Sequence, residues 1–393
     1  MERRSFIRLV GLNGLVAAAS ACATRGSRLE PAAAPASVIR LSSNENAHGP
    51  GDRVLAAVRE SLASANRYAF GAAGELRDAI AQAHGVPPSH VRPGCGSSQV
   101  LDAIVASTVG PDRVLVTAAP TFELAAGRAR ALGAPVVEVP VDPSLRLDLD
   151  GMAARAAGAG LIYVCNPNNP TGTLHDAAAI ARFVEDVMRR APGATVLIDE
   201  AYHEYVERPG HVSAVALARD NPRVIVVRTF SKIFGMAGLR VGYAIARPET
   251  LRPLSAYLDG LSLSVLSVNA ALAALSDTER VAEQRARNSA TRAFTADALR
   301  RAGCRVFESE ANFLMADVGR DVRLFGEACR RHGIEIARPF PPLLTHARIT
   351  IGTMQEMQAA VPVFMDVLRT PAPATRLEAP APYVPRSEGA WAC

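Results

Sequence analysis

One repeated pattern constrains the fold of this chain more than any other feature. Between residues 52 and 246, short apolar runs alternate with longer Ala-rich amphipathic segments. Short runs rich in Val and Ile are typical of buried strands, and strands that alternate with helices form a mostly parallel sheet covered on both faces. The predicted strands are residues 114–117, 161–165, 196–198, 224–227 and 241–246. We therefore expect an α/β fold.

The later part of the chain predicts a second, smaller α+β domain. Residues 280–302 are rich in Arg and Ala and predict one long helix, and short strands are expected around residues 305–307, 313–316 and 348–351. The expected organisation is an N-terminal arm of the small domain at 29–52, a large domain at 53–264, a small C-terminal domain at 265–370, and a Pro- and Ala-rich tail at 371–393.

The composition excludes several classes of protein. Apolar residues make up 49% of the 393 residues and charged residues 21%, which is typical of a globular chain and not of a disordered one. The formal net charge of +5 comes from scattered residues without a basic stripe among aromatics, so nucleic-acid binding is not expected. The six cysteines form no Cys-x-x-Cys pair, so we expect neither a metal site nor a disulfide framework.

The amino terminus resembles an export signal. Arg3 and Arg4 precede Phe6 and a weakly apolar stretch at residues 9–23, which is too short to span a bilayer. We interpret residues 1–28 as a twin-arginine-type signal that directs the protein to the periplasm or the cell surface. The alternative is a frayed basic start of a protein that is not exported. A lipoprotein-like box ends at Cys22 without the usual Leu three places before it, so a lipid on Cys22, the only membrane attachment we expect, stays open.

Polar residues end the predicted strands, where parallel sheets bind their ligands. Gly94 to Gln99 open an amphipathic helix, and free amides at a helix N-terminus favour a phosphate. The other polar residues at these ends are Asn169, Asp199, Tyr202, Thr229, Lys232 and, eight residues later, Arg240. Of the 43 basic side chains only Lys232 is a lysine, so any chemistry that needs a side-chain primary amine must use it.

In this order and spacing, the residues resemble the fold-type I pyridoxal 5′-phosphate (PLP) aminotransferases, and among them the histidinol-phosphate aminotransferase family. The similarity covers residues 38–368. Its carriers are residues 41–46, 67–68, 94–99, 120–122, 166–172, 199–202, Ser231 and Lys232 with Arg240, and 348–353. The resemblance implies a mostly parallel seven-stranded sheet, PLP as cofactor, an amino acid and a 2-oxo acid as substrates, and a homodimer with shared active sites.

The resemblance also implies roles around the cofactor. Lys232 would hold PLP as a Schiff base and shuttle the substrate proton, which requires a pKa lowered by burial or by neighbouring cations. Asp199 would keep the pyridine nitrogen protonated. Asn169 and Tyr202 would donate hydrogen bonds to the phenolate oxygen, although an ordinary core tyrosine is the alternative for Tyr202.

Further implied contacts complete the cofactor site. Phe122 would stack on the cofactor ring. The residues implied to hold the phosphate are Ser97, Ser98, Gln99, Thr229 and Arg240, with Tyr68 reaching it from the neighbouring subunit.

Four residues are implied to bind substrate. Arg348 would grip the α-carboxylate with its planar fork, and Arg338 matches an arginine that contacts a substrate phosphate in the family. Residues 44–49 read Asn-Glu-Asn-Ala-His-Gly, so Asn46 keeps the family pattern while His48 replaces a tyrosine that cradles substrate. That replacement and the export signal argue against histidine biosynthesis.

The leading hypothesis is an exported aminotransferase. Two alternatives remain: another PLP reaction on an amino acid, such as decarboxylation, elimination or oxidative deamination, and a non-catalytic exported binding lipoprotein.

Overall fold

The computed structural model describes residues 38–258 and 261–371. Contacts divide the chain into Met1–Ser37 and Val38–Cys393, and every described residue belongs to the second unit. The export signal predicted at residues 1–28, with Cys22, lies outside the described residues, as does most of the predicted tail. The domain boundaries predicted within the second unit stay predictions.

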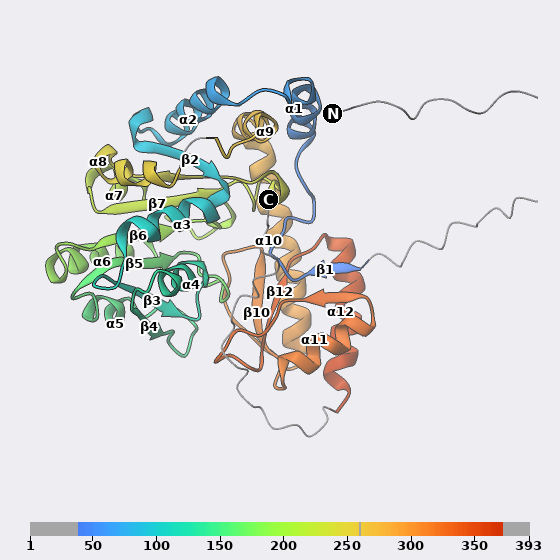
Figure 1. Ribbon diagram of the computed structural model, residues 1–393. Coiled ribbons are helices and arrows are strands. Elements are labelled where there is room, and N and C mark those ends of the chain that lie inside the picture. Colours follow the sequence, from blue (N-terminus) through green and yellow to red (C-terminus); the bar gives the residue numbers. More distant parts are fainter. Residues whose placement is uncertain (1–37, 259–260, 372–393) are drawn as a thin grey trace, which may run out of the picture. The chain divides into compact units, whose positions relative to one another are not determined.

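The largest sheet has seven strands in the order β2-β8-β7-β6-β5-β3-β4 (Figure 1). The strands are β2 (Val91–Cys95), β3 (Val114–Ala119), β4 (Val136–Pro140), β5 (Ala159–Cys165), β6 (Thr195–Asp199), β7 (Val224–Thr229) and β8 (Val241–Ile245). Strand β8 pairs antiparallel with β2 and β7, and the other pairs are parallel. The predicted α/β class with a mostly parallel seven-stranded sheet is confirmed.

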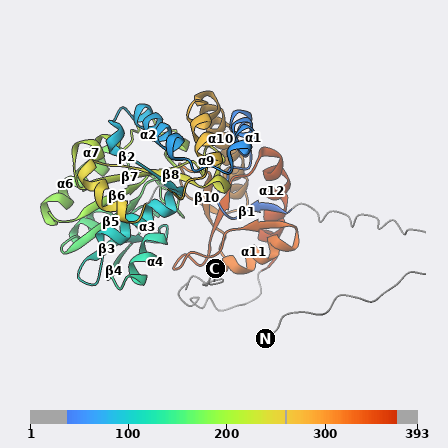
Figure 2. The same cartoon turned by 45° about the horizontal axis from the view of Figure 1, so that its top comes forward.

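Successive residues of the central strands enter two separate cores. In β6, Val196 and Ile198 pack in one core while Leu197 packs in the other, because adjacent side chains of a strand point to opposite faces. The first core is covered by α1 (Asp52–Ser61), α2 (Phe70–His84), α5 (Leu149–Ala154), α6 (Ala177–Arg190), α7 (Val215–Asp220) and α9 (Val265–Leu275). The second is covered by α3 (Gly96–Thr108), α4 (Leu124–Ala131) and α8 (Pro248–Leu251). Figure 2 shows the sheet between α2, α6 and α7 on one side and α3 and α4 on the other.

The two strands that the sequence pattern did not predict, β2 and β4, are the edges of the sheet. Strand β2 reads Val-Arg-Pro-Gly-Cys, and an edge strand tolerates Pro93 because only one side of it carries ladder hydrogen bonds. Edge strands are also less buried, so they lack the continuous apolar run by which the inner strands are recognised.

The remaining elements form two smaller sheets with three helices. Strands β9 (Arg305–Val306), β10 (Phe313–Asp317) and β12 (His346–Thr350) pair antiparallel, and β1 (Ile39–Leu41) pairs parallel with β11 (Ile334–Ile336). The helices are α10 (Thr278–Arg301), α11 (Val322–Arg331) and α12 (Met354–Arg369). The helix predicted at 280–302 and the three predicted strands are present within a few residues. The β1–β11 pair joins segments nearly 300 residues apart, which no local pattern predicts.

The strand directions determine where polar residues gather. Strands β5, β6 and β7 are parallel, so their last residues lie side by side at the carboxyl ends of these strands. Because β8 runs the opposite way, the residue before it, Arg240, lies at this same end of the sheet. Among the described residues, no helix is both long and apolar enough to cross a bilayer.

Candidate active site

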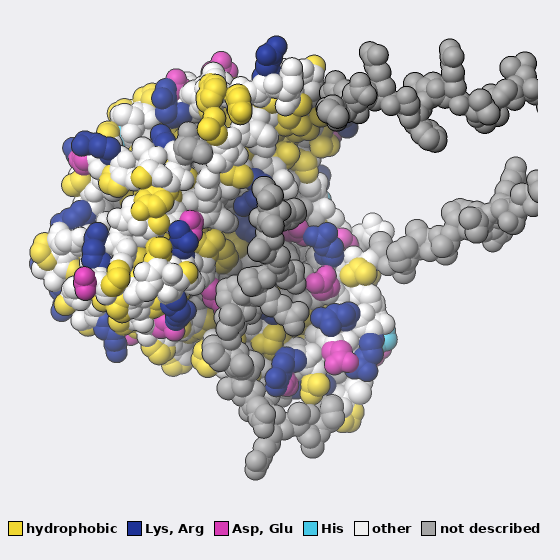
Figure 3. All heavy atoms as spheres, in the orientation of Figure 1, with side chains coloured by type: hydrophobic (Ala, Val, Ile, Leu, Met, Phe, Trp, Pro, Cys, Tyr) yellow, Lys and Arg dark blue, Asp and Glu magenta, His cyan; other side chains and the backbone are white. Residues whose placement is uncertain are grey.

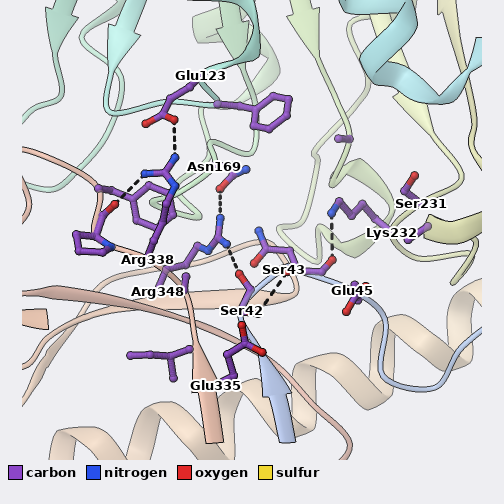
Figure 4. A pocket seen from close by; sticks show the side chains of 18 of the residues that line it. Ser42, Ser43, Glu45, Glu123, Asn169, Ser231, Lys232, Glu335, Arg338 and Arg348 are labelled. Carbon is purple, nitrogen blue, oxygen red and sulfur yellow. Dashed lines mark hydrogen bonds and ion pairs between the residues drawn. The ribbon is translucent and has the colours of Figure 1, made fainter. Parts of the chain in front are cut away.

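A cavity of about 1220 Å³ opens at the carboxyl ends of the parallel strands of the seven-stranded sheet. Figure 4 shows side chains from both parts of the fold pointing into it. The predicted site residues that line it are Ser97, Ser98, Phe122, Asn169, Asp199, Tyr202, Thr229, Lys232, Arg240, Arg338 and Arg348. Its lining does not include four others: Asn46, His48, Tyr68 and Gln99.

Lys232 lies in the wall of the cavity three residues beyond the end of β7. Its Nζ donates a hydrogen bond to the carbonyl oxygen of Asn44 at 3.1 Å. Burial and, next, the Arg348 guanidinium lower the pKa of Lys232 to about 8. The amine is therefore much more often neutral near pH 7–8 than a solvated lysine, as a nucleophilic or basic role requires.

Asp199 is the last residue of β6 and is only 2% exposed. The Tyr163 hydroxyl donates to its Oδ2 at 2.9 Å, and the Ala201 N–H donates to its Oδ1 at 3.1 Å. Burial raises the pKa of Asp199 to about 6, although both hydrogen bonds oppose the rise. The carboxylate is thus ionised at neutral pH but held in a setting that favours a cationic partner. Tyr163 belongs to a predicted strand, but no local pattern indicates that its hydroxyl turns to Asp199.

Asn44 links several of these groups and was not predicted as a site residue. It has a left-handed backbone, with φ of 54°. Its Nδ2 donates to the Tyr202 hydroxyl at 3.0 Å, and its Oδ1 accepts from the Thr350 hydroxyl at 3.0 Å. Because its carbonyl oxygen also accepts from Lys232, Asn44 fixes Tyr202 and Lys232 relative to β12. Its burial and positive φ are seen only in the structure; the sequence offers only an asparagine in the arm, a residue type that tolerates this backbone conformation.

The start of α3 forms an anion cradle. Ser97 and Ser98 occupy its first turn, where the backbone N–H groups of a helix have no intrahelical partner. Arg240 lies beside this turn: a Cβ built on Gly96 would come 2.8 Å from the guanidinium carbon of Arg240. Together with Thr229, these groups offer the donors and positive charge that a phosphate needs.

Gln99 supports this turn instead of lining the cavity. Its Oε1 accepts from the Cys95 N–H at 2.7 Å, and its Nε2 donates to the Ser262 hydroxyl at 2.9 Å. Both ends of the side-chain amide are therefore engaged away from the cradle. The phosphate contact predicted for Gln99 stays a prediction that this arrangement does not favour.

Gly96→Ala should weaken PLP binding by at least about tenfold, because the added methyl group displaces Arg240 from the cradle. Gly133→Ala is the matched control, since both glycines have φ of 74° and nothing lies within 4 Å of a Cβ on Gly133. The two variants share the backbone strain but only one loses the arginine. Titration of each apoprotein with PLP, followed by absorbance, measures the difference; equal affinities would contradict the cradle.

Arg348 is a buried cation in β12, with 8% of its surface exposed. Its Nη1 donates to Oδ1 of Asn169 at 2.7 Å, and its guanidinium carbon lies 4.7 Å from the ring centre of Phe340. Its Nε has no hydrogen-bond partner among the described residues. Burial lowers the pKa of Arg348 to about 10, so it remains charged at neutral pH. Since Oδ1 of Asn169 accepts this bond, its amide nitrogen remains as a donor.

A buried ion network ties together the strand ends that carry Asp199 and Thr229. Arg228, 4% exposed, donates to Glu200 at 2.8 Å and to Glu204 at 2.6 Å. Burial opposes ionisation of Glu200, but Arg228, together with His203 and the hydrogen bonds from Ser213 and Ala214, outweighs it, so the pKa of Glu200 lies below its usual range. Removing one member would leave an uncompensated buried charge, so the network fixes β6 against β7. The arginine inside the apolar run of β7 was the overlooked signal.

The remaining predicted residues lie outside the cavity lining. Asn46 donates from Nδ2 to the carbonyl oxygen of Ile233 at 2.9 Å, so it supports the residue that follows Lys232. His48 is half-buried, and burial together with Arg287 and Arg280 lowers its pKa. Tyr68 is 75% exposed and does not line the cavity. The roles predicted for these three stay predictions.

The family match agrees with this geometry. The model of a protein family described as "Aminotransferase class I and II" matches residues 36–364 of the chain. The chain belongs to this family. It is 38% identical over 322 residues to a histidinol-phosphate aminotransferase of Symbiobacterium thermophilum, covering 81% of this chain and 87% of that protein. It is 39% identical over 323 residues to an aromatic amino acid aminotransferase of Mycobacteroides abscessus, covering 82% and 90%.

A solved structure has the same fold as this aminotransferase. The histidinol-phosphate aminotransferase of Sinorhizobium meliloti, in complex with pyridoxal 5′-phosphate, superposes with a TM-score of 0.79 at 28% identity, covering 84% of this chain and 91% of that one. The predicted family, cofactor and reaction class are confirmed: the protein is a PLP-dependent aminotransferase. The other PLP reactions and the binding lipoprotein are not favoured.

The residues present fit PLP. The cavity offers the partly buried amine of Lys232, the buried carboxylate of Asp199 at a strand end, and an anion cradle whose Gly96 leaves room for the Arg240 guanidinium. When bound, PLP supplies an electron sink for the pair released at the substrate α-carbon. Within the described residues, no group of three or more His, Cys, Asp or Glu side chains could hold a metal ion.

Proposed function

We propose that this aminotransferase moves the α-amino group between an amino acid with a ring-bearing side chain and a 2-oxo acid. The observation that carries the proposal is Arg348, a buried guanidinium that lies over the Phe340 ring in the same cavity as Lys232. A planar fork in that position suits a substrate carboxylate, and the adjacent ring suits an apolar, flat side chain. The two relatives support this class, since one is named for aromatic amino acids and the other for histidinol phosphate.

In this proposal the chain's own groups have separate tasks. Lys232 takes the proton from the substrate α-carbon and returns one, which its lowered pKa permits. Asp199 would hold the pyridine nitrogen in its protonated form, and Asn169 and Tyr202 would donate to the phenolate oxygen. The Phe122 ring would pack against the cofactor ring. Ser97, Ser98, Thr229 and Arg240 would hold the phosphate.

We also propose a homodimer with shared active sites. Leu62, Tyr68 and Phe70 are 58%, 75% and 64% exposed, and the rings of Tyr68 and Phe70 lie 5.4 Å apart. Figure 3 shows hydrophobic side chains gathered over the region of α1, α2 and α9. Large apolar side chains that are exposed together are typical of a protein interface. Tyr68 of one protomer would reach the phosphate cradle of the other.

We also propose that residues 1–28 direct export of the protein and that Cys22 carries a lipid. It is supported by the paired Arg3 and Arg4 and by the short apolar segment that follows them. Fractionation of cells that carry the full chain, with an Arg3→Ala and Arg4→Ala double variant as control, tests the route.

The proposed substrate class is tested by single-turnover half-reactions of the purified protein with individual amino acids and with histidinol phosphate. Phenylalanine, tyrosine and histidine should react fastest and should yield the 2-oxo acid without release of carbon dioxide or uptake of oxygen. A protein that reacts as fast with alanine as with these donors would contradict the proposed substrate class.

Arg348→Ala should lower kcat/KM for donors with an α-carboxylate by an amount that corresponds to about 2–5 kcal/mol. Truncation removes the fork that bonds the carboxylate. Arg348→Lys should recover only part of the loss, because an ammonium cannot bond both oxygens in the same plane. Arg130→Ala is the control, since this exposed arginine pairs with Glu138 away from the cavity. A parent enzyme equally efficient with amines and amino acids would make Arg348 irrelevant to recognition.

A further inference from the structure

Arg338 and Glu123 form an ion pair in the same cavity as Arg348. Arg338 follows β11 and Glu123 directly precedes α4. The Nη2 of Arg338 donates to Oε2 of Glu123 at 2.5 Å. Figure 4 shows the two side chains pointing toward one another near Arg348. The carboxylate therefore comes from the N-cap of a helix that covers the seven-stranded sheet, and the guanidinium comes from the segment after a strand of the two-stranded sheet.

The Glu123 side chain points away from the helix that it precedes. Glu123 is the N-cap residue of α4, where an acidic side chain commonly interacts with the free amides of its own helix. Its side chain makes no such capping bond. The carboxylate lines the cavity instead and pairs with Arg338.

Phe340 connects this ion pair to Arg348. The guanidinium carbons of Arg338 and Arg348 lie 4.6 and 4.7 Å from the centre of the same Phe340 ring, so the two cations are neighbours. After burial, Arg338 also lowers the pKa of Arg348, and Glu123 opposes that effect. Glu123 thus adds one negative charge beside two positive ones.

We propose that Glu123 selects the charge of the substrate side chain by neutralising Arg338. The inference rests on the proposed function, in which Arg348 holds the α-carboxylate and the side chain extends along Phe340. A neutral ring then meets a neutral ion pair. An anionic side chain must separate Arg338 from Glu123 and approach a second carboxylate, which costs binding energy. Without the Glu123 charge, Arg338 becomes a site for a distal carboxylate or phosphate.

The test measures equilibrium binding of two unreactive carboxylates to the holoenzyme by spectroscopic titration. Succinate carries a second carboxylate, and 3-phenylpropionate carries a ring. Glu123→Gln should bind succinate at least about fivefold more tightly, since a like charge nearby is removed, and 3-phenylpropionate within about twofold of the parent. The ratio kcat/KM for glutamate over phenylalanine should rise in the same direction.

Two further variants make the result specific. Glu138→Gln removes the carboxylate of the exposed pair with Arg130, which does not line the cavity, and should leave both affinities unchanged. Adding Arg338→Gln to Glu123→Gln should abolish the gain for succinate, because the cation that attracts it is lost. A gain that persists in the double variant, or equal changes for the two ligands, would overturn the role of Glu123.

The two proposals fail in distinguishable ways. A parent enzyme that transaminates none of the ring-bearing amino acids would refute the proposed substrates, while the succinate and 3-phenylpropionate affinities would still report on Glu123. Conversely, an unchanged succinate affinity in Glu123→Gln would refute the charge selection and leave the proposed substrates standing.

Discussion

Lys232→Ala should abolish amino-group transfer, lowering kcat/KM by at least about four orders of magnitude, which corresponds to about 5–6 kcal/mol at 1.4 kcal/mol per tenfold. No other residue can take over, because Lys232 is the only lysine in the chain. Lys232→Arg should fail as completely, since a guanidinium stays protonated and is a poor nucleophile and base. This second variant keeps the positive charge of the site, so its failure would show that a neutral amine is required.

Covalent labelling tests the same residue without relying on turnover. Incubation of the parent with PLP followed by borohydride should leave one pyridoxyl group on Lys232, detected by mass spectrometry. The Lys232→Ala protein has no ε-amine, so any label it acquires can lie only on the terminal α-amine. A label on an internal peptide of that variant would refute the assignment of Lys232.

The pH dependence of this labelling should follow the lowered pKa of Lys232. The pKa of Lys232 is lowered to about 8, first by burial and then by Arg348. The neutral fraction of this amine therefore rises through pH 8, and labelling at limiting PLP should rise with a midpoint near that value. A solvated lysine would show its midpoint near 10.4. In Arg348→Ala the midpoint should move upward, because a neighbouring cation has been removed.

The sequence predicted the centre of the fold better than its edges. Inner strands such as β5 and β6 are buried on both faces, so their apolar runs are continuous and their polar last residues are easily noticed. This is why the sequence alone predicts that Asp199, which ends β6, lies at the site. Strands β2 and β4 lie at the sheet edges and lack such runs.

The contacts between distant segments could not be predicted from local pattern. Asn44 meets Thr350 across 306 positions of the chain, and Glu123 meets Arg338 across 215. Asn44 lies in the arm and Glu123 at a helix terminus, so both also have an ordinary local place. Only the folded arrangement shows that their polar atoms face the cavity, so the sequence indicated the cofactor chemistry but not the groups that position it.

Asp199→Asn should lower the rate of the first half-reaction by about three orders of magnitude or more, roughly 4 kcal/mol, while the apoprotein becomes no less stable. An amide cannot keep the pyridine nitrogen protonated, so the electron sink at the substrate α-carbon is lost. Asparagine retains the size of the side chain and can still accept from the Ala201 N–H. Single-turnover absorbance with phenylalanine measures the rate, and PLP titration of the apoprotein should show a much smaller change in affinity.

The expected stability follows from the direction of the pKa shift. Burial raises the pKa of Asp199 to about 6 in the folded protein, whereas an unfolded aspartate titrates near 3.9. The folded state therefore binds more protons between these values, and the stability of the parent apoprotein falls as the pH rises through 6. At pH 7.5 the ionised buried carboxylate costs about 3 kcal/mol, a cost that asparagine does not carry. Urea midpoints of the two apoproteins should differ in favour of the variant at pH 7.5 and converge toward pH 4. A variant that is less stable than the parent at pH 7.5 would mean that Asp199 supports the fold and would remove the argument that its charge serves the cofactor.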